Sequence, residues 1–322
     1  MGKYRRAFGP HDPDNTYVAH SFAEQVFDTG EVQLNYATAG DAGRPALLLI
    51  PGQTESWWGY EAAIPLLAER FHVFAVDLRG QGRSTRTPGR YTLDNIANDL
   101  VRFIDGVIGR PAIVAGLSSG GVIATWLAAY ARPGQVIAAY LEDPPLFASE
   151  VRPAVGQNID QSAGPIFGLL AKYLGDQWSI GDWDGVVAGV TEELPERLVF
   201  VARMLGLGAE PPQQLKEYDP EWGRAFCSGT VYGGCEHVRM LGAVKVPVLF
   251  THHFRMVDET SGMLLGAISD HQVAAVGDLI TKAGNDFRLV SFPEMGHSMH
   301  GQDPAKYTET LTAWATDLAL VS

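Results

Sequence analysis

The stretch Pro111-Ala-Ile-Val-Ala-Gly-Leu-Ser118-Ser-Gly-Gly-Val-Ile-Ala-Thr-Trp126 decides the fold. It predicts a short apolar strand, a turn spelled Gly116-Leu-Ser118-Ser-Gly120, and an apolar helix. A G-x-S-x-G turn between a strand and a helix is a nucleophile elbow, in which a strained serine stands exposed above the sheet. Gly116 and Gly120 lack side chains, so the backbones on either side of the serine can pass closely. The pattern therefore predicts that Ser118 is a nucleophile, whereas a tight glycine turn that only packs or binds phosphate is the alternative.

Apolar runs and helical patterns alternate on both sides of this turn. Strands are expected over residues 20–27, 32–39, 46–50, 72–77, 136–141, 246–251 and 287–292, with helices over 93–108, 269–282 and 304–320. Continuous apolar runs are typical of parallel strands buried on both faces. The alternation stops between residues 147 and 241, where helical segments rich in aromatic residues predict an inserted cap. The expected class is α/β, with the α/β-hydrolase fold, a core over residues 1–146 and 242–322, and a helical cap over 147–241.

A serine hydroxyl needs a general base, and in this fold the base histidine comes last in the chain. The stretch Ser291-Phe-Pro-Glu-Met-Gly296-His297-Ser-Met-His300 follows the last expected strand. Its position and the flexible Gly296 indicate His297 as the base, with His300 as the second candidate. A metal-binding His-x-x-His pair is disfavoured, because no carboxylate or cysteine cluster completes a ligand set.

The carboxylate that orients the base has three candidates. Asp258 lies in the loop after residues 246–251, which is the usual place, but it comes late in that loop. Glu142 and Asp143 end the strand after the elbow helix, at the edge of the sheet where ligands bind in α/β folds. Haloalkane dehalogenases, which are similar in fold, can place an acid at the spacing of Glu142, 24 residues after Ser118. We therefore expect Glu142, with Asp143 and Asp258 as alternatives.

Two backbone N–H groups are expected to stabilise the oxyanion that forms during attack. Ser119 follows the nucleophile directly, and Gln53 lies in the loop Pro51-Gly52-Gln53 after the strand over residues 46–50.

Composition limits the partners and the compartment. The 322 residues carry a formal net charge of −13, which argues against nucleic acid and against an anionic membrane surface. No apolar run is long enough for a membrane helix and no secretory signal is recognisable, so a cytoplasmic protein is expected. In a reducing compartment Cys227 and Cys235 are expected to be free thiols. The charged N-terminal arm leaves a homodimer open.

Beyond these generic motifs, the chain resembles the zearalenone lactone hydrolases, and looks closest to the bacterial ones. The resemblance rests on Gly-Leu-Ser118-Ser-Gly, on Leu-Glu142-Asp-Pro-Pro, on Gly-His297, and on five further strings. These are Gln53-Thr-Glu-Ser-Trp-Trp58, Val73-Phe-Ala-Val-Asp-Leu-Arg-Gly-Gln-Gly-Arg-Ser84, Asp176-Gln-Trp-Ser-Ile-Gly-Asp-Trp183, Lys216-Glu-Tyr-Asp-Pro-Glu-Trp-Gly-Arg-Ala-Phe226 and Thr251-His-His253. The chain departs from the pattern at Leu117, at Gly52 and over residues 187–207, which bears on substrate range more than on chemistry.

The resemblance implies a glutamate acid, which is Glu142 here, and attack of Ser118 on the ester carbonyl of a resorcylic macrolactone. It implies an acyl-enzyme at Ser118, released by water that His297 activates, with no cofactor and no metal. The expected partner is a small aromatic lactone, and the substrate-binding candidates are Trp58, Trp178, Trp183, Pro144 and His300. The alternatives are a general carboxylesterase or carbon–carbon bond hydrolase with the same triad, a ligand receptor built on the hydrolase fold, and a cofactor-free oxygenase or perhydrolase.

Overall fold

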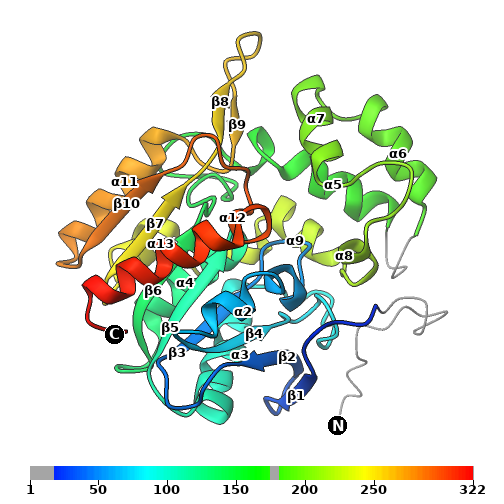
Figure 1. Cartoon of the computed structure of the whole chain (residues 1–322). Coiled ribbons are helices and arrows are strands. Elements are labelled where there is room, and N and C mark those ends of the chain that lie inside the picture. The colour runs from blue at the N-terminus through cyan, green and yellow to red at the C-terminus, as the bar shows by residue number, and fades with distance from the viewer. Residues whose placement is uncertain (1–17, 175–180, 322) are drawn as a thin grey trace.

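A sheet of eight strands forms the centre of the part of the chain that the computed structural model describes, residues 18–174 and 181–321 (Figure 1). The strand order is β1-β2-β4-β3-β5-β6-β7-β10. The strands are β1 (Glu24–Asp28), β2 (Gln33–Ala39), β3 (Ala46–Ile50), β4 (His72–Val76), β5 (Ala112–Leu117), β6 (Val136–Glu142), β7 (Val248–His252) and β10 (Phe287–Ser291). The pairs β1–β2 and β2–β4 are antiparallel, and the other neighbours are parallel. The predicted fold class, a mostly parallel sheet flanked by helices, is confirmed.

Helices cover both faces of this sheet, which explains why β3 and β5 are apolar along their whole length. One face packs against α3 (Leu93–Phe103), α4 (Ser119–Tyr130), α10 (His237–Leu241) and α11 (Asp270–Lys282). The other face packs against α2 (Ile64–Leu67) and α13 (Pro304–Asp317). Every residue of β3 and of β5 is buried as a result. The expected cap of α3 is present, since Thr92 Oγ1 accepts the N–H of Asn95 at 3.2 Å.

In the described part of the segment between β6 and β7, a further group of α-helices follows. They are α5 (Gly164–Tyr173), α6 (Trp183–Glu192), α7 (Glu196–Met204), α8 (Gln213–Lys216) and α9 (Glu221–Ser228). Of these, α5, α6 and α7 lie to the right of the core in Figure 1. The helix α10, which also falls within the predicted cap, packs against α4 and α11 of the core. The division into a core and a cap at residues 147 and 241 stays a prediction.

One element was not expected from the sequence. The segment after β7 forms a hairpin of β8 (Arg255–Val257) and β9 (Leu264–Gly266), which projects from the molecule in Figure 1. Its strands have three residues each, too few to show an alternating pattern. The hairpin begins where a loop was predicted.

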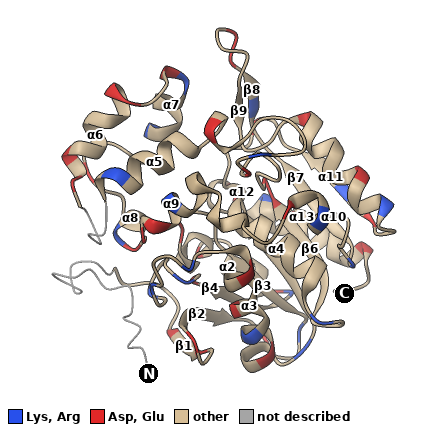
Figure 2. Ribbon diagram, turned by 180° about the vertical axis from the view of Figure 1, so that it is seen from behind, with Lys and Arg blue, Asp and Glu red and all other residues tan. Residues whose placement is uncertain are grey.

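The surface charges are mixed in sign. In the ribbon of Figure 2, acidic and basic residues both occur along α6 and α7 and the segments that join them. Among the described residues, no helix is long and apolar enough to cross a membrane. The arm on which the expectation of a homodimer rests, residues 1–15, lies outside the described residues.

Candidate active site

Ser118 stands on a strained turn between β5 and α4. Its backbone has φ 54° and ψ −122°, a region that residues other than glycine rarely adopt. A Cβ at Gly116 would lie 2.2 Å from the carbonyl oxygen of Gly120, and a Cβ at Gly120 would lie 2.3 Å from that of Ile50. The two glycines are therefore required by close backbone approach. Strain of this kind, held by the surrounding structure, is typical of functional sites.

The histidine predicted as base contacts a carboxylate, and that carboxylate is Asp143. His297 Nδ1 lies 2.7 Å from Asp143 Oδ2. Asp143 is 1% exposed, while the side chain of His297 is 41% exposed and open to a substrate. His253 donates its backbone N–H to Asp143 Oδ1 at 3.1 Å, which fixes the carboxylate. The prediction that Glu142 contacts His297 is wrong in this structure.

The physical reason lies in the direction of neighbouring side chains. Glu142 is the last residue of β6, and Asp143 leaves the strand with φ 44°. The backbone turns between the two residues, so their side chains take different directions. The Glu142 carboxylate instead accepts from His300 Nδ1 at 2.7 Å. The third candidate, Asp258, closes the turn of the β8–β9 hairpin by accepting the N–H of Ser261 at 2.8 Å.

The pair His297–Asp143 is electrostatically suited to base catalysis. Desolvation lowers the pKa of His297, but the hydrogen bond and charge of Asp143 outweigh it and raise the pKa above its ordinary value. Desolvation raises the pKa of Asp143, but the same hydrogen bond and the charge of His297 bring it below its ordinary value. Asp143 therefore stays ionised and stabilises the protonated imidazole.

The loop after β3 lies directly against the nucleophile. A Cβ at Gly52 would lie 3.3 Å from Ser118 Cβ, so this loop passes over the serine. Among the described residues, the backbone N–H groups of Gln53 and Ser119 have no hydrogen-bond acceptor. That these two N–H groups bind the oxyanion stays a prediction. The side chain of Gln53 donates to the hydroxyl of Tyr218, which connects this loop to the inserted segment.

Two glutamates that were not predicted from the sequence hold this loop. Gly52 N–H donates to Glu55 Oε2 at 3.2 Å, and Trp58 Nε1 donates to Glu217 Oε2 at 2.9 Å. Glu217 is 1% exposed, and burial raises its pKa. Both glutamates fall within the strings that carry the resemblance, which was the available signal for them. Their contacts hold the oxyanion loop from both sides.

The three tryptophans predicted to bind substrate differ in their burial and contacts. Trp58 is half-buried at the contact with Glu217 and stacks on His20 at 5.4 Å. Trp183 is buried and donates to the carbonyl of Gly208 at 3.0 Å, so it packs within the inserted helices. Trp178 lies outside the described residues.

Pro144 and His300 are the remaining two substrate-binding candidates. Pro144 is buried close to the first turn of α4. A Cβ added at Gly121 in that turn would lie 2.9 Å from Pro144 Cβ. His300 is fully buried beneath the loop that carries His297. A direct contact of either residue with substrate stays a prediction.

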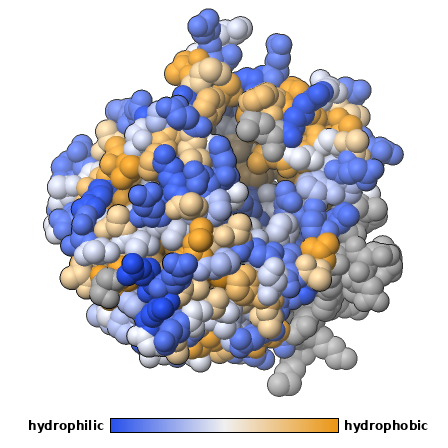
Figure 3. All heavy atoms as spheres, viewed as in Figure 1, coloured by the Kyte–Doolittle hydropathy of each residue, from blue (hydrophilic) through white to orange (hydrophobic). Residues whose placement is uncertain are grey.

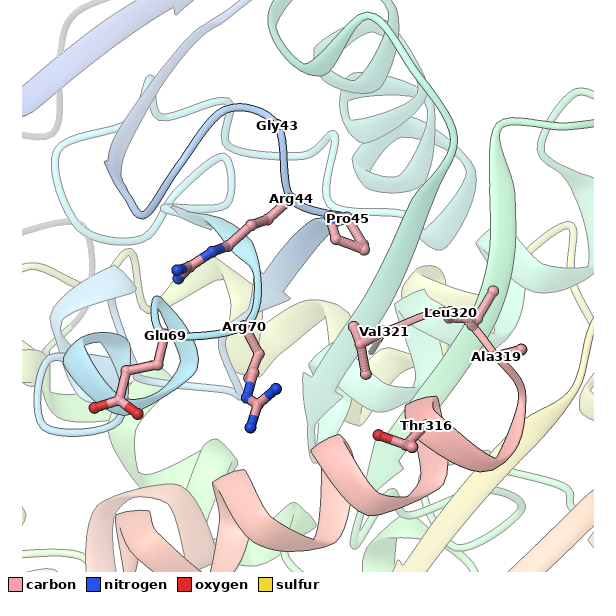
Figure 4. A pocket seen from close by; sticks show the side chains of 9 residues that line it. All are labelled: Gly43, Arg44, Pro45, Glu69, Arg70, Thr316, Ala319, Leu320 and Val321. Atoms are coloured by element: carbon pink, nitrogen blue, oxygen red, sulfur yellow. The ribbon is translucent and has the colours of Figure 1, made fainter.

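The candidate site lies at the carboxyl edge of the parallel strands, where α/β folds bind ligands. Figure 3 shows a recess on this face between the inserted helices and the part of the core that carries α12 (Met299–Gln302). A second hollow opens at the opposite edge of the sheet, before β3 and β4 (Figure 4). It is lined by Gly43, Arg44, Pro45, Glu69, Arg70, Thr316, Ala319, Leu320 and Val321. This second hollow contains none of the predicted catalytic residues.

Two further expectations concern metals and cysteines. Among the described residues, no group of three His, Cys, Asp or Glu side chains is placed to hold a metal ion. His297 and His300 contact different carboxylates. Cys227 and Cys235 are both free thiols, as expected.

The chain is similar to known hydrolases in sequence and in fold. The model of a family described as "Alpha/beta hydrolase family" matches residues 47–310. Epoxide hydrolase 4 of Mus musculus is 24% identical over 314 residues, which cover 94% of this chain and 82% of that protein. 3-oxoadipate enol-lactonase 2 of Acinetobacter baylyi is 35% identical over 113 residues, covering 34% of this chain and 42% of that protein. The crystal structure of the enol-lactonase from Burkholderia xenovorans, 17% identical, matches with a TM-score of 0.63 over 91% of this chain and 100% of that one, which shows a shared fold.

Proposed function

The chain belongs to the alpha/beta hydrolase family, and we propose that it is a serine hydrolase that opens a macrocyclic resorcylic acid lactone of the zearalenone type. One observation carries the catalytic part of this proposal. Ser118 is strained on its elbow, and the loop that carries Gln53 lies against it. The pair His297–Asp143 lies at the same edge of the sheet.

In the proposed acylation, His297 acts first as a base and then as an acid. Ser118 Oγ attacks the ester carbonyl while its proton passes to His297 Nε2, and Asp143 stabilises the imidazolium that forms. The N–H groups of Gln53 and Ser119 stabilise the oxyanion, a contribution of about 3 kcal/mol per donor. The bond between the acyl carbon and the ring oxygen then breaks, and His297 returns the proton to the leaving alcohol.

Deacylation repeats these steps with water. His297 removes a proton from a water molecule, whose oxygen attacks the acyl carbon, and Ser118 leaves with that proton. In a lactone the alcohol stays tethered to the acyl group, so the product is a single ring-opened hydroxy acid.

The chemistry of serine favours an ester over an epoxide as the substrate. Attack of Ser118 on an acyl carbon gives an ester that water can cleave, which completes the cycle. Attack on an epoxide would give a serine alkyl ether, which neither His297 nor water can cleave under mild conditions. The relatives named as enol-lactonases support a cyclic ester, and the strings of the inserted segment that resemble zearalenone lactone hydrolases support the larger ring.

The test is chromatography of zearalenone incubated with the purified protein, with Ser118→Ala as the matched control. We expect the wild type alone to convert the lactone to its ring-opened hydroxy acid, with one heavy oxygen in the carboxylate when the reaction is run in ¹⁸O-water. Turnover of a small aryl ester without turnover of the lactone would instead indicate a general carboxylesterase. Binding of the lactone without turnover of either ester would indicate a ligand receptor.

A further inference from the structure

A second carboxylate–histidine pair lies behind the first and is completely buried. Glu142 and His300 are each 0% exposed, and Glu142 Oε2 lies 2.7 Å from His300 Nδ1. Glu142 Oε1 also accepts the backbone N–H groups of Met299 at 2.6 Å and of His300 at 3.0 Å. One carboxylate therefore holds three donors of the segment that directly follows His297.

This buried pair also contacts the loops of the nucleophile and the oxyanion hole. The His300 ring stacks on Tyr60, with ring centroids 3.8 Å apart and planes inclined by 22°. The Tyr60 hydroxyl donates to the last carbonyl of β3 at 3.0 Å and accepts the N–H of Leu117 at 3.2 Å. His300 Nε2 lies 3.9 Å from Glu55 Oε2, the carboxylate that holds Gly52. The pair thus connects the ends of β3, β5 and β6 to the histidine segment.

The segment around His297 is held from two sides. From one side, His253 Nδ1 lies 2.9 Å from the carbonyl oxygen of Gly296 and 3.1 Å from that of His297. From the other side, Glu142 holds the amides of Met299 and His300. His297 itself is fixed to the protein at Nδ1 by Asp143, while its side chain is partly exposed. The position of the partly exposed His297 ring therefore depends on the hydrogen bonds that hold the residues before and after it.

We propose that Glu142 and His300 are positioning residues, a buried pair that sets the place of the His297 ring between Asp143 and Ser118. The proposal rests on the proposed function, since it requires that Ser118 and His297 act together. A buried ion pair is costly to desolvate and contributes little net stability against apolar residues of the same size. Its many hydrogen bonds to one catalytic segment instead suit the fixing of geometry, where a displacement of about 1 Å can lower a rate by about 100-fold.

The substitutions that test this proposal are Glu142→Gln and Glu142→Ala. Glutamine keeps an oxygen for the two backbone amides and an amide for the His300 ring, so we expect kcat within about 10-fold of the wild type. Alanine leaves three buried donors without an acceptor, so we expect kcat to fall by about 100-fold with KM within about 3-fold. The assay is hydrolysis of a chromogenic aryl acetate, normalised by labelling of Ser118 with a fluorophosphonate so that only folded, competent enzyme is counted.

Two readouts separate positioning from other roles. Because Asp143 raises the pKa of His297 more than Glu142 does, the acid limb of the kcat/KM profile is expected to move much less in Glu142→Gln than in Asp143→Asn. If the two residues act as one unit, the double variant Glu142→Ala with His300→Phe falls no further than the worse single variant.

The outcomes distinguish a failure of the positioning role from a failure of the proposed function. Full kcat in Glu142→Ala overturns the positioning role alone. A loss in Glu142→Gln as large as in Asp143→Asn also overturns it, since Glu142 would then be the acid of the triad. If Glu142→Ala does not fold, Glu142→Gln and its pH profile still decide between these cases. A wild type that neither hydrolyses the ester nor reacts with the fluorophosphonate overturns the proposed function and, with it, the positioning role.

Discussion

Replacing Asp143 with asparagine removes the negative charge nearest to the catalytic base. In the wild type Asp143 is 1% exposed, and its Oδ2 lies 2.7 Å from His297 Nδ1. At a charge separation of about 4 Å and an effective dielectric constant of about 20, the carboxylate stabilises the imidazolium by about 4 kcal/mol. Since about 1.4 kcal/mol is tenfold in rate, kcat is expected to fall by about 1,000-fold. Loss of the correct tautomer of His297 can bring the fall to about 10,000-fold.

The pH profile gives the sign of the effect. His297 must be neutral to act as a base, and Asp143 raises its pKa, so the acid limb of kcat/KM for the wild type is expected above the ordinary histidine value. In Asp143→Asn that limb moves to lower pH. The matched control is Asp317→Asn, which removes a carboxylate at the end of α13 that is 58% exposed. It should leave kcat and the pH of the acid limb unchanged. A kcat for Asp143→Asn within about 10-fold of the wild type would refute this reasoning.

Two further predictions concern the elbow and a buried glutamate. Gly120→Ala places a Cβ 2.3 Å from the last carbonyl of β3, so the free energy of unfolding measured in urea is expected to fall by more than about 4 kcal/mol. Gly208→Ala, where a Cβ meets nothing within 4 Å, should change it little; equal losses would contradict the packing argument. Burial raises the pKa of Glu150 to about 7, so its protonated form favours folding at low pH, and this stability is lost as pH rises from about 4.5 through about 7. Melting temperatures at pH 5 and pH 8 should therefore differ more in the wild type than in Glu150→Gln, by the equivalent of up to about 3 kcal/mol, and an equal pH dependence of the two proteins would refute the assignment.

The core of the fold could be predicted because its signals are local. Strand β3 is apolar throughout, as burial on both faces requires, and the glycines around Ser118 leave a short, specific motif. The helix α3 begins at Leu93, directly after the capping residue Thr92 that its pattern indicates. The projecting hairpin was not predictable, since Arg255–Val257 carries no pattern of its own and is defined by its partner strand.

The acid that contacts His297 could be predicted only to within two adjacent residues. Spacing placed Glu142 and Asp143 at the correct edge of the sheet, and the resemblance favoured Glu142. The choice between two adjacent carboxylates depends on which one faces His297, and this follows from the end of β6 and the positive φ of Asp143. No composition or spacing signal reports the side-chain direction of a residue in the turn that follows a strand. The contacts of Glu217 across the chain to Trp58 are likewise set by tertiary packing.

The most direct test of the central claim is intact-protein mass spectrometry of the enzyme quenched in acid during turnover of zearalenone, followed by peptide mapping. If Ser118 is acylated, the protein gains the mass of the whole lactone, because the leaving alcohol remains tethered to the acyl group, and the modified peptide contains Ser118. The adduct should be absent from Ser118→Ala. Ring-opened product without any adduct at Ser118 when deacylation is slowed at low pH, or an adduct on Asp143 or Glu142, would contradict the account.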